Sequence, residues 1–378
     1  MQDFDSQPCI FKDEEVEQAV QELFSYPVLI QGMKAFLPAA LNEMALNEKD
    51  KVKTVSDFQQ RIILKILDWI KSISITQLSG SGFEQLDPNE RYLFISNHRD
   101  IVLDSAFLNT VLFERGFTTS QIAIGDNLMK HRISELIFKI NKSFVVRRTG
   151  TAVELYKYSV KLSQYITDLI TNKKDSVWIA QREGRSKDGN DRTQPGVLKM
   201  LSLSNQGDLV SFFQQLNIVP VAISYEFDPC DLLKTQEYLK KNYDPEYKKS
   251  FDEDVAYILQ GLVGRKGETH FHFGDPLHEA LNELEAIANN KKQLEALAQI
   301  IDRSIHTNYK LHAINYVACD LLNGSSEYAS FYTPEQKQEY VTYFEDKIRQ
   351  ITPELQAEGR KYLLGIYANP LINSLLYN

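Results

Sequence analysis

The middle of the chain alternates between short apolar runs and longer segments with helical spacing. Turn-forming Gly, Asn, Asp and Pro residues separate these segments. Such alternation is typical of strands connected by helices, and it predicts an α/β fold with a mostly parallel, mixed sheet flanked by helices. The runs that we expect to form strands lie at 73–75, 93–96, 121–124, 143–147, 176–181, 218–224 and 269–273, and the helices between them at 101–113, 133–140, 151–170, 197–203 and 251–262.

The two ends of the chain have helical patterns instead. Acidic side chains at 13–15 precede apolar residues at helical spacing, and 56–59 have the sequence of a capping box before a long amphipathic helix. Thr333 and Thr352 each precede a proline, an order typical of a helix start. Because 378 residues exceed the usual size of a single core, we predict an N-terminal helical region at 1–72, an α/β domain at 73–280 and a C-terminal helical region at 281–378.

Two apolar surfaces in these helical regions allow two interpretations each. The N-terminal stripes can form a core or face lipid, and we favour a core because most amphipathic helices of soluble proteins pack inward. The segment 362–377 is apolar but contains Gly365 and Pro370, and a docked helix is favoured over a membrane-touching tail. The run 24–41 is interrupted by prolines and a lysine, so we do not expect it to span a bilayer.

Composition narrows the class of protein further. The formal net charge of −9 argues against a nucleic-acid binder and against electrostatic adsorption of the whole surface to an anionic membrane. Cys9, Cys230 and Cys319 are widely spaced without metal-ligand spacing, which is typical of a reducing compartment. The acidic start at 1–5 has no apolar segment behind it, so no signal peptide is expected.

The polar turn after the run 93–96 carries the strongest candidate for catalysis. His98 follows a buried strand, where its ring can be held rigidly and still meet a substrate. Asp100 and Asp104 are each close enough in sequence to bond one ring nitrogen, and a carboxylate that fixes the tautomer of a histidine makes a general base. The alternative is a histidine that only caps a helix or completes a turn.

Two further strand ends carry groups that suit an anion. Arg147 and Arg148 end one run in a locally basic segment, and arginine forks match phosphate oxygens. The loop 183–186 combines a glycine that permits close backbone approach with an arginine and a serine. The alternative for the arginine pair is a solvated charge cluster.

Pro220, inside a strand, indicates an edge, a bulge or a functional turn. His270 and His272 have no evident third ligand, so no metal site is expected.

Taken in order, four motifs resemble those of the glycerolipid acyltransferase family, the superfamily of glycerol-3-phosphate and 1-acylglycerol-3-phosphate acyltransferases. They are 97–99 with a following aspartate, 144–149, 183–186 and 218–226, and the segment 273–277 resembles the family's closing strand and turn. The resemblance covers 73–277 and departs from the family pattern twice. Five residues instead of four separate His98 from Asp104, so either the first turn is bulged or Asp100 takes the partner's role. We favour Asp104, because it enters the helix as the family's aspartate does. In the third motif, the family has one further residue between the glycine and the arginine, whereas Gly184 directly precedes Arg185 here.

The resemblance implies an acyltransferase that moves a fatty acyl chain from an acyl thioester to the hydroxyl of a glycerol-phosphate-type acceptor. It implies acyl-CoA or acyl carrier protein as co-substrate, no metal or bound cofactor, and a cytoplasmic enzyme that is peripheral at the inner membrane face. An amino-acid lipid as acceptor, a thioesterase, and a non-catalytic lipid- or acyl-carrier-binding module remain alternatives. The residues it implies are His98 with Asp104 or Asp100 for catalysis, and Asn97, Arg99, Arg147, Arg148, Glu183, Gly184, Arg185, Ser186 and Pro220 for substrate binding.

Overall fold

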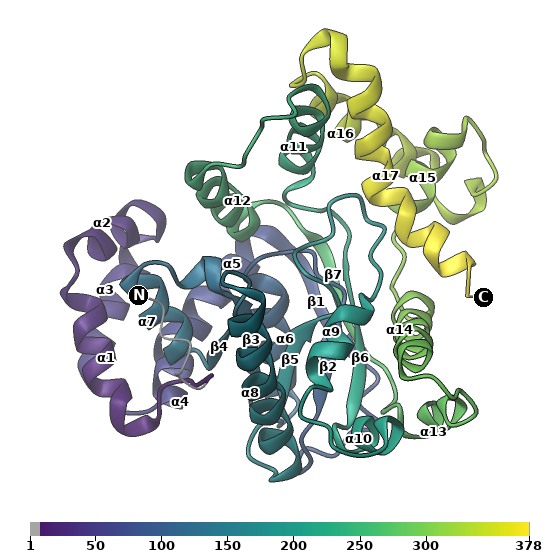
Figure 1. The fold of residues 1–378 in the computed structure, drawn as a ribbon. Helices are drawn as coiled ribbons and strands as arrows, with labels where there is room; N and C mark the ends of the chain where they lie inside the picture. The colour runs from purple at the N-terminus through teal and green to yellow at the C-terminus, as the bar shows by residue number, and fades with distance from the viewer. Residues whose placement is uncertain (1–7, 378) are drawn as a thin grey trace.

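One seven-stranded sheet forms the centre of the protein. The computed structural model describes residues 8–377, so the acidic start at 1–5 lies outside them. The strand order is β1-β7-β6-β2-β5-β3-β4, and neighbours are parallel except for the antiparallel pair β6 and β7 (Figure 1). This confirms the predicted α/β fold with a mostly parallel, mixed sheet. The strands are β1 Ile75–Ser81, β2 Leu93–Ser96, β3 Gln121–Gly125, β4 Ser143–Val146, β5 Val177–Ala180, β6 Ile218–Tyr225 and β7 Gly267–Phe273.

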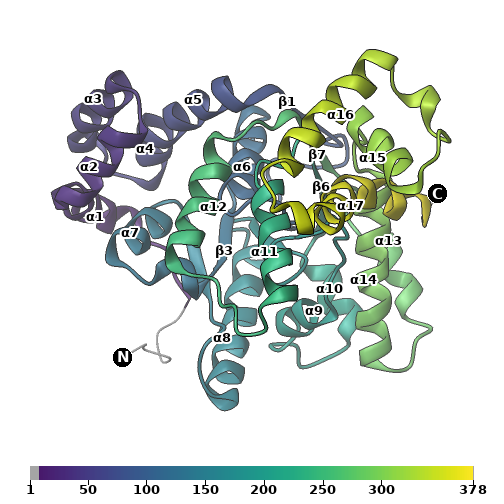
Figure 2. The same cartoon turned by 90° about the horizontal axis from the view of Figure 1, so that it is seen from above.

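Helices surround the sheet and form a group at each end of the chain. The N-terminal and C-terminal groups lie on opposite sides of the molecule (Figure 2). The α-helices are α1 Asp13–Ser25, α2 Pro27–Phe36, α3 Ala39–Glu48, α4 Val55–Phe58, α5 Leu64–Ser74, α6 Leu103–Glu114, α7 Arg132–Ile140, α8 Ala152–Thr171, α9 Pro195–Leu201, α10 Leu209–Gln215, α11 Asp231–Tyr243, α12 Phe251–Val263, α13 His278–Leu281, α14 Asn290–Thr307, α15 Ala313–Asn323, α16 Pro334–Ile348 and α17 Gln356–Leu375.

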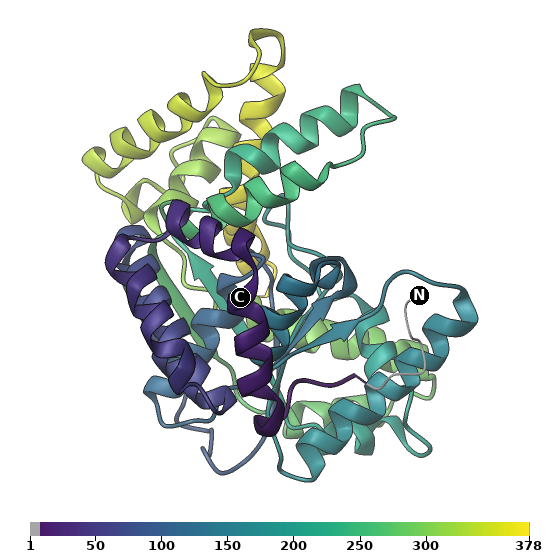
Figure 3. The same cartoon turned by 90° about the vertical axis from the view of Figure 1, so that its left-hand side faces the viewer.

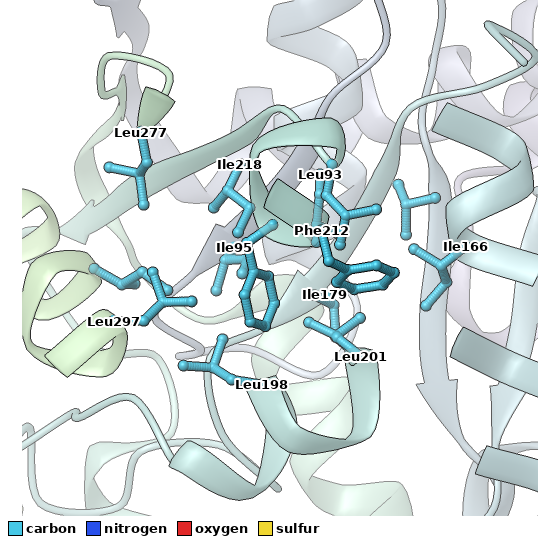
Figure 4. Packing of buried hydrophobic residues seen from close by; sticks show 14 of the residues in the cluster. Leu93, Ile95, Ile166, Ile179, Leu198, Leu201, Phe212, Ile218, Leu277 and Leu297 are labelled. Atoms are coloured by element: carbon cyan, nitrogen blue, oxygen red, sulfur yellow. The ribbon is translucent and has the colours of Figure 1, made fainter. Parts of the chain in front are cut away.

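The central strand β2 is buried on both faces, which explains its continuous apolar sequence. Successive side chains of a strand point to opposite faces. Leu93 and Ile95 therefore pack with α8, α9, α10 and α14, in the core that Figure 4 shows. Phe94 faces the opposite core, which includes α5 and α6. Both faces of β2 are covered, so the residue that follows its carboxyl end is held by a rigid strand.

The N-terminal helices form a core of their own with α7. Figure 3 shows these helices lying together, in purple. Val16, Val20 and Phe58 are buried there, which confirms the inward packing of these stripes, whereas none of the residues of α2 is buried. The helix cap lies two residues before the expected position, because the Thr54 side chain accepts from the Asp57 N–H at 3.1 Å. A π-helical turn at Gln59–Ile63 joins α4 to α5.

The C-terminal helices enclose a third apolar core, and α17 is docked into it. Leu363, Tyr367 and Leu371 of α17 are buried among residues of α15 and α16, which confirms the docked form of the segment 362–377. Thr333 caps α16 through its side chain as predicted, whereas Thr352 makes no side-chain cap bond at the short 3-10 helix Pro353–Leu355. Among residues 8–377, none of the helices is long and apolar enough to cross a membrane.

Several local predictions were wrong for identifiable reasons. The run 73–75 is mostly the end of α5, because apolar residues at a helix end resemble a short strand over so few positions. Helices α10 and α11 were not expected. Pro220 lies inside an inner strand, neither at an edge nor at a bulge. Its carbonyl accepts from the Gly274 N–H at 2.8 Å, just past the end of β7. The N–H that a proline lacks would also face this place, where the pairing of β6 with β7 has already ended, so the sheet loses no hydrogen bond.

Candidate active site

A histidine paired with a buried aspartate stands at the carboxyl end of β2. His98 Nδ1 lies 2.8 Å from Asp104 Oδ2. The His98 side chain is 15% exposed and the Asp104 side chain is fully buried. An imidazole that donates from Nδ1 to a carboxylate has its lone pair on Nε2. The pair therefore has the geometry of a general base and its orienting carboxylate.

Asp104 is held by three further hydrogen bonds. Its Oδ2 also accepts from the backbone N–H groups of Arg99 at 2.6 Å and Asp100 at 3.0 Å, and its Oδ1 accepts from the Tyr225 hydroxyl at 2.9 Å. The residue added between His98 and Asp104 is accommodated because 97–102 form a non-helical turn and α6 begins at Leu103. Asp104 then lies in the first turn of α6, where the helix dipole favours a carboxylate.

Asp100 has a different position from the one that a partner of His98 would need. Its Oδ1 accepts from the N–H groups of Val102 at 2.9 Å and Leu103 at 2.8 Å, so its carboxyl caps the start of α6. Burial and the neighbouring charge of Asp104 raise the pKa of Asp100 above its ordinary value. The structure therefore pairs Asp104, and not Asp100, with His98.

Asn97 and Arg99 have contacts that the substrate-binding prediction did not foresee. The Asn97 amide bonds the backbone of Ile223 twice, donating to its carbonyl at 2.8 Å and accepting from its N–H at 2.7 Å. The guanidinium of Arg99 is buried and donates to the Tyr309 hydroxyl at 3.1 Å. Both side chains thus bond other parts of the protein and help to fix the turn around His98, and their contact with substrate stays a prediction.

The loop after β5 holds the backbone of His98 from the other side. The Ser186 N–H donates to the His98 carbonyl at 2.8 Å, and the His98 N–H donates to Asp191 Oδ2 at 3.0 Å. Gly184 has a φ of +70°, a conformation that requires glycine here although a Cβ would meet no atom within 4 Å. The sequence placed Ser186 and Gly184 near the site, but it gave no sign that Asp191 would reach His98.

The predicted phosphate-binding arginines are spread over three neighbourhoods. Arg147 lies over the Tyr158 ring of α8 at 4.8 Å, and Arg185 lies over the Tyr257 ring of α12 at 4.5 Å. Arg148 Nε lies 3.6 Å from Glu183 Oε1, so the second and third motifs meet there. The structure brings Arg148 and Glu183 together but does not gather all three arginines into one contact.

Two buried groups in the loop that holds the His98 backbone still have hydrogen-bonding capacity. Arg185 Nη1 and Ser186 Oγ are both buried and have no hydrogen-bond partner among the described residues. A buried donor without a partner carries an energetic cost that an anionic oxygen can remove.

Pro220 is level with Ile95 in the neighbouring strand, three residues or about 10 Å before His98 along the strand direction. The structure does not bring Pro220 to the histidine.

Trp178 and Tyr225 support the pair, although the sequence did not single them out for this role. The Trp178 ring packs against the His98 ring with centroids 5.6 Å apart and planes at 73°, and its Nε1 donates to Ser96 Oγ at 2.9 Å. Tyr225 ends β6 and reaches Asp104. Tyr225 lies inside the fourth motif, 218–226, but the motif gave no sign that its hydroxyl would reach Asp104, and only its position in a buried run could have indicated Trp178.

A large apolar cavity begins close to the turn. It has a volume of about 980 Å³ and lies between the N-terminal helices and α6. Ile101 and Val102 line it, three and four residues after His98. Phe113 and Leu259 also line it and are 42% and 43% exposed, so its walls reach the protein surface. The cavity has the size and the lining of a site for an extended apolar ligand.

The histidines of β7 have structural partners. Ser81 Oγ lies 2.8 Å from His270 Nε2 and 2.9 Å from His272 Nδ1, and Ser79 Oγ lies 2.8 Å from His270 Nδ1. Across residues 8–377, His, Cys, Asp and Glu side chains form no group of three or more that could hold a metal ion. These two histidines therefore connect β1 to β7.

Comparison with known proteins identifies the α/β part of the chain. No curated protein matches the sequence. Among solved structures, the crystal structure of the 1-acyl-sn-glycerophosphate (LPA) acyltransferase PlsC from Thermotoga maritima is similar at 11% identity, covering 76% of this chain and 93% of that chain with a TM-score of 0.33. Residues 78–224 match the family model described as Acyltransferase, and they include the first three motifs and most of the fourth. This match supports, for residues 78–224, the resemblance to acyltransferases that the motifs indicate.

Proposed function

We propose that the chain transfers a fatty acyl group from an acyl thioester to the hydroxyl of a glycerol-phosphate-type acceptor. The observation that carries the proposal is the contact of His98 Nδ1 with Asp104 Oδ2 at 2.8 Å, within a segment that matches the acyltransferase family. Asp104 fixes the tautomer in which Nε2 can take a proton, and it stabilises the imidazolium that then forms.

The reaction follows from this arrangement. His98 Nε2 removes the proton of the acceptor hydroxyl while the hydroxyl oxygen attacks the thioester carbonyl. The new C–O bond forms and the C–S bond breaks. The leaving thiolate then takes the proton from the imidazolium, which returns His98 to its neutral form. This sequence conserves protons and needs no metal or bound cofactor, and the thioester of CoA or of an acyl carrier protein is the co-substrate.

The surroundings of His98 support both substrates. The apolar cavity that begins at Ile101 suits a fatty acyl chain, because burying each CH₂ group contributes about 0.8 kcal/mol. Arg185 Nη1 and Ser186 Oγ, both buried without a hydrogen-bond partner among the described residues, suit the oxygens of an acceptor phosphate. Ser186 is in contact with His98 through its backbone N–H. A phosphate there would place the acceptor hydroxyl beside the base.

We also propose that the enzyme works at the inner face of the cytoplasmic membrane without spanning it. Val28, Phe113 and Leu259 are large apolar residues on the surface, and the last two belong to the cavity wall. A lipid surface that covers these residues would let an acyl chain enter the cavity without crossing water.

The acceptor assay tests the proposed function. A labelled long-chain acyl thioester is incubated with wild type and His98→Ala, in the presence of glycerol 3-phosphate, 1-acylglycerol 3-phosphate, an amino-acid lipid, or no acceptor. The proposal predicts an ester product with one glycerophosphate acceptor and its loss in His98→Ala. Release of free fatty acid at the same rate without acceptor would show a thioesterase. Product only with the amino-acid lipid, or binding without turnover, would also overturn the proposal.

A further inference from the structure

We propose that Tyr309, outside the matched family segment, is a positioning residue that holds His98 in place through Arg99. Tyr309 lies between α14 and α15, in the C-terminal helical region. The inference rests on the proposed function in taking His98 as the base. It adds a role for a part of the chain that the family match does not cover.

Arg99 follows His98 directly and its side chain is turned into the protein. The residue is 6% exposed, its Nη2 donates to the Tyr309 hydroxyl at 3.1 Å, and its guanidinium carbon lies 5.5 Å from the centroid of the Tyr309 ring. A buried guanidinium is costly to leave without partners, so a partner that satisfies it also fixes its position. Tyr309 supplies both an acceptor oxygen and an aromatic face to this charge.

The backbone of Arg99 is fixed from the C-terminal side as well. Lys234 Nζ donates to the Arg99 carbonyl at 3.3 Å and pairs with Asp228 Oδ2 at 2.6 Å, and both charged side chains are almost fully buried. The Asp228 N–H donates to the hydroxyl of Tyr367 in α17 at 3.1 Å. Arg99 is therefore held at its guanidinium and at its carbonyl by groups that lie after residue 224.

Tyr309 is itself anchored next to the catalytic pair. The N–H of Lys310 donates to Ser224 Oγ at 2.9 Å, which ties this segment to the end of β6. The next residue of β6, Tyr225, donates to Asp104. The Arg99 N–H donates to the same carboxylate. A displaced Arg99 would therefore move the N–H that helps to orient Asp104, and small misplacements of a base cost up to about a hundredfold in rate.

Tyr309→Phe is the variant that separates positioning from packing. It keeps the ring and removes only the oxygen that accepts from Arg99. The matched control is Tyr340→Phe. Tyr340 belongs to α16 in the same helical region, is 4% exposed against 7% for Tyr309, and donates to Glu226 Oε1 at 2.9 Å. Each variant thus removes one buried hydroxyl that bonds a charged group, but only Tyr309 contacts the turn of His98.

The first readout is steady-state acyl transfer. We expect Tyr309→Phe to lower kcat by about tenfold or more while the KM values for donor and acceptor stay within about twofold, because the base is misplaced and the substrate sites are intact. Tyr340→Phe should leave both parameters within about twofold. Equal kcat losses in the two variants, or unchanged kcat in Tyr309→Phe, would overturn the proposal.

The second readout does not depend on turnover. In protein labelled with ¹⁵N-histidine, the resonance of the His98 Nδ1 proton is identified by its absence in His98→Gln. We expect this resonance to shift or broaden in Tyr309→Phe and to stay unchanged in Tyr340→Phe. If wild type transfers no acyl group, the proposed function fails, and the NMR comparison still decides whether Tyr309 positions His98. An unchanged resonance in Tyr309→Phe would contradict the inference.

Discussion

Asn97 determines where His98 stands, although its own side chain bonds only the protein backbone. Its amide pairs with both backbone polar groups of Ile223, as the next residue of a strand would do. Strand β2 is in effect extended by one pair, and His98 follows directly. The amide also satisfies two backbone groups that lie where water does not reach, because Ile223 is fully buried.

Asn97→Ala should therefore destabilise the fold strongly. It leaves the N–H and the carbonyl of Ile223 buried without partners, which costs about 2–4 kcal/mol of the free energy of unfolding. Asn205→Ala is a matched control, because the Asn205 amide bonds both backbone groups of Gly207 in an exposed loop. We expect less than about 1 kcal/mol there. Urea denaturation of the two variants measures both values, and equal losses would contradict this account of Asn97.

A buried histidine in the C-terminal region predicts how stability depends on pH. Burial, and next the charge of Lys310, lower the pKa of His312 from its ordinary value to about 4. Between pH 6.5 and 4 the unfolded chain then binds a proton that the folded chain does not, so the free energy of unfolding falls as the pH is lowered through this window. At pH 5 this single group costs about 2 kcal/mol.

His312→Gln checks that sign. The loss of unfolding free energy between pH 7 and pH 5 should be smaller by about 2 kcal/mol in the variant than in wild type, because the group that titrates is gone. Urea denaturation at the two pH values gives both differences. A pH dependence that is the same in the variant and in wild type would show that His312 does not contribute.

At the scale of residues, the sequence predicted which side chains gather at the carboxyl end of β2, but not which of them contact one another. His98 could be found because it follows a buried apolar run. The choice between Asp100 and Asp104 depends on the three-dimensional structure, since the turn 97–102 has no regular spacing from which a side-chain direction follows. Arg99 shows the limit most clearly, because Tyr309, its partner, lies 210 residues further along the chain.

The elements differ in how well their sequences defined them. Strands such as β6 are buried along their whole length, and such runs were located within one or two residues. Helices α10 and α11 were missed. Helix α10 has only seven residues, and α11 buries polar residues such as Asp231 and Lys234 that its apolar pattern does not reveal. Their positions depend on partners elsewhere in the fold, which a local pattern does not contain.

Two glycines give opposite predictions for their elements. Gly32 lies inside α2, and a Cβ there meets no atom within 4 Å, so Gly32→Ala should raise the free energy of unfolding by about 0.5–1 kcal/mol through its helix propensity. Gly189 has a φ of +78°, and a Cβ there would lie 2.2 Å from the Ile366 carbonyl oxygen of α17. Gly189→Ala should lower stability by more than about 1 kcal/mol. Thermal denaturation of both variants checks the signs, and two changes of the same sign would contradict this comparison.

At the scale of the whole molecule, the apolar cavity is a product of assembly. Its walls come from the N-terminal helices, from α6 and from α12, which are far apart in the sequence. The sequence indicated apolar stripes on these helices, but not that they would leave space between them. The order of the strands is equally non-local, because β7 and β1 close one edge although 185 residues separate their nearest ends in the chain, Ser81 and Gly267.

Filling the cavity should change the preference for acyl chain length. Ala106 lines the cavity on α6, one helical turn after Val102. In Ala106→Phe, the rate of transfer from a long-chain thioester should fall about tenfold or more, and the rate from a short-chain thioester should change little, because only the long chain needs the blocked space. Competition between the two donors in one assay measures the ratio. An unchanged ratio would show that the chain binds elsewhere.

The central claim is that His98 acts as a base oriented by Asp104, and the rates of four proteins test it most directly. Wild type, His98→Ala, Asp104→Asn and Asp100→Asn are compared for acyl transfer to the best acceptor, after circular dichroism has shown that each is folded. We expect His98→Ala and Asp104→Asn to lose about a hundredfold or more, because the base or its orientation is lost. Asp100→Asn should keep activity within about tenfold of wild type, since an amide oxygen can still cap α6. An active Asp104→Asn beside an inactive Asp100→Asn would contradict the account.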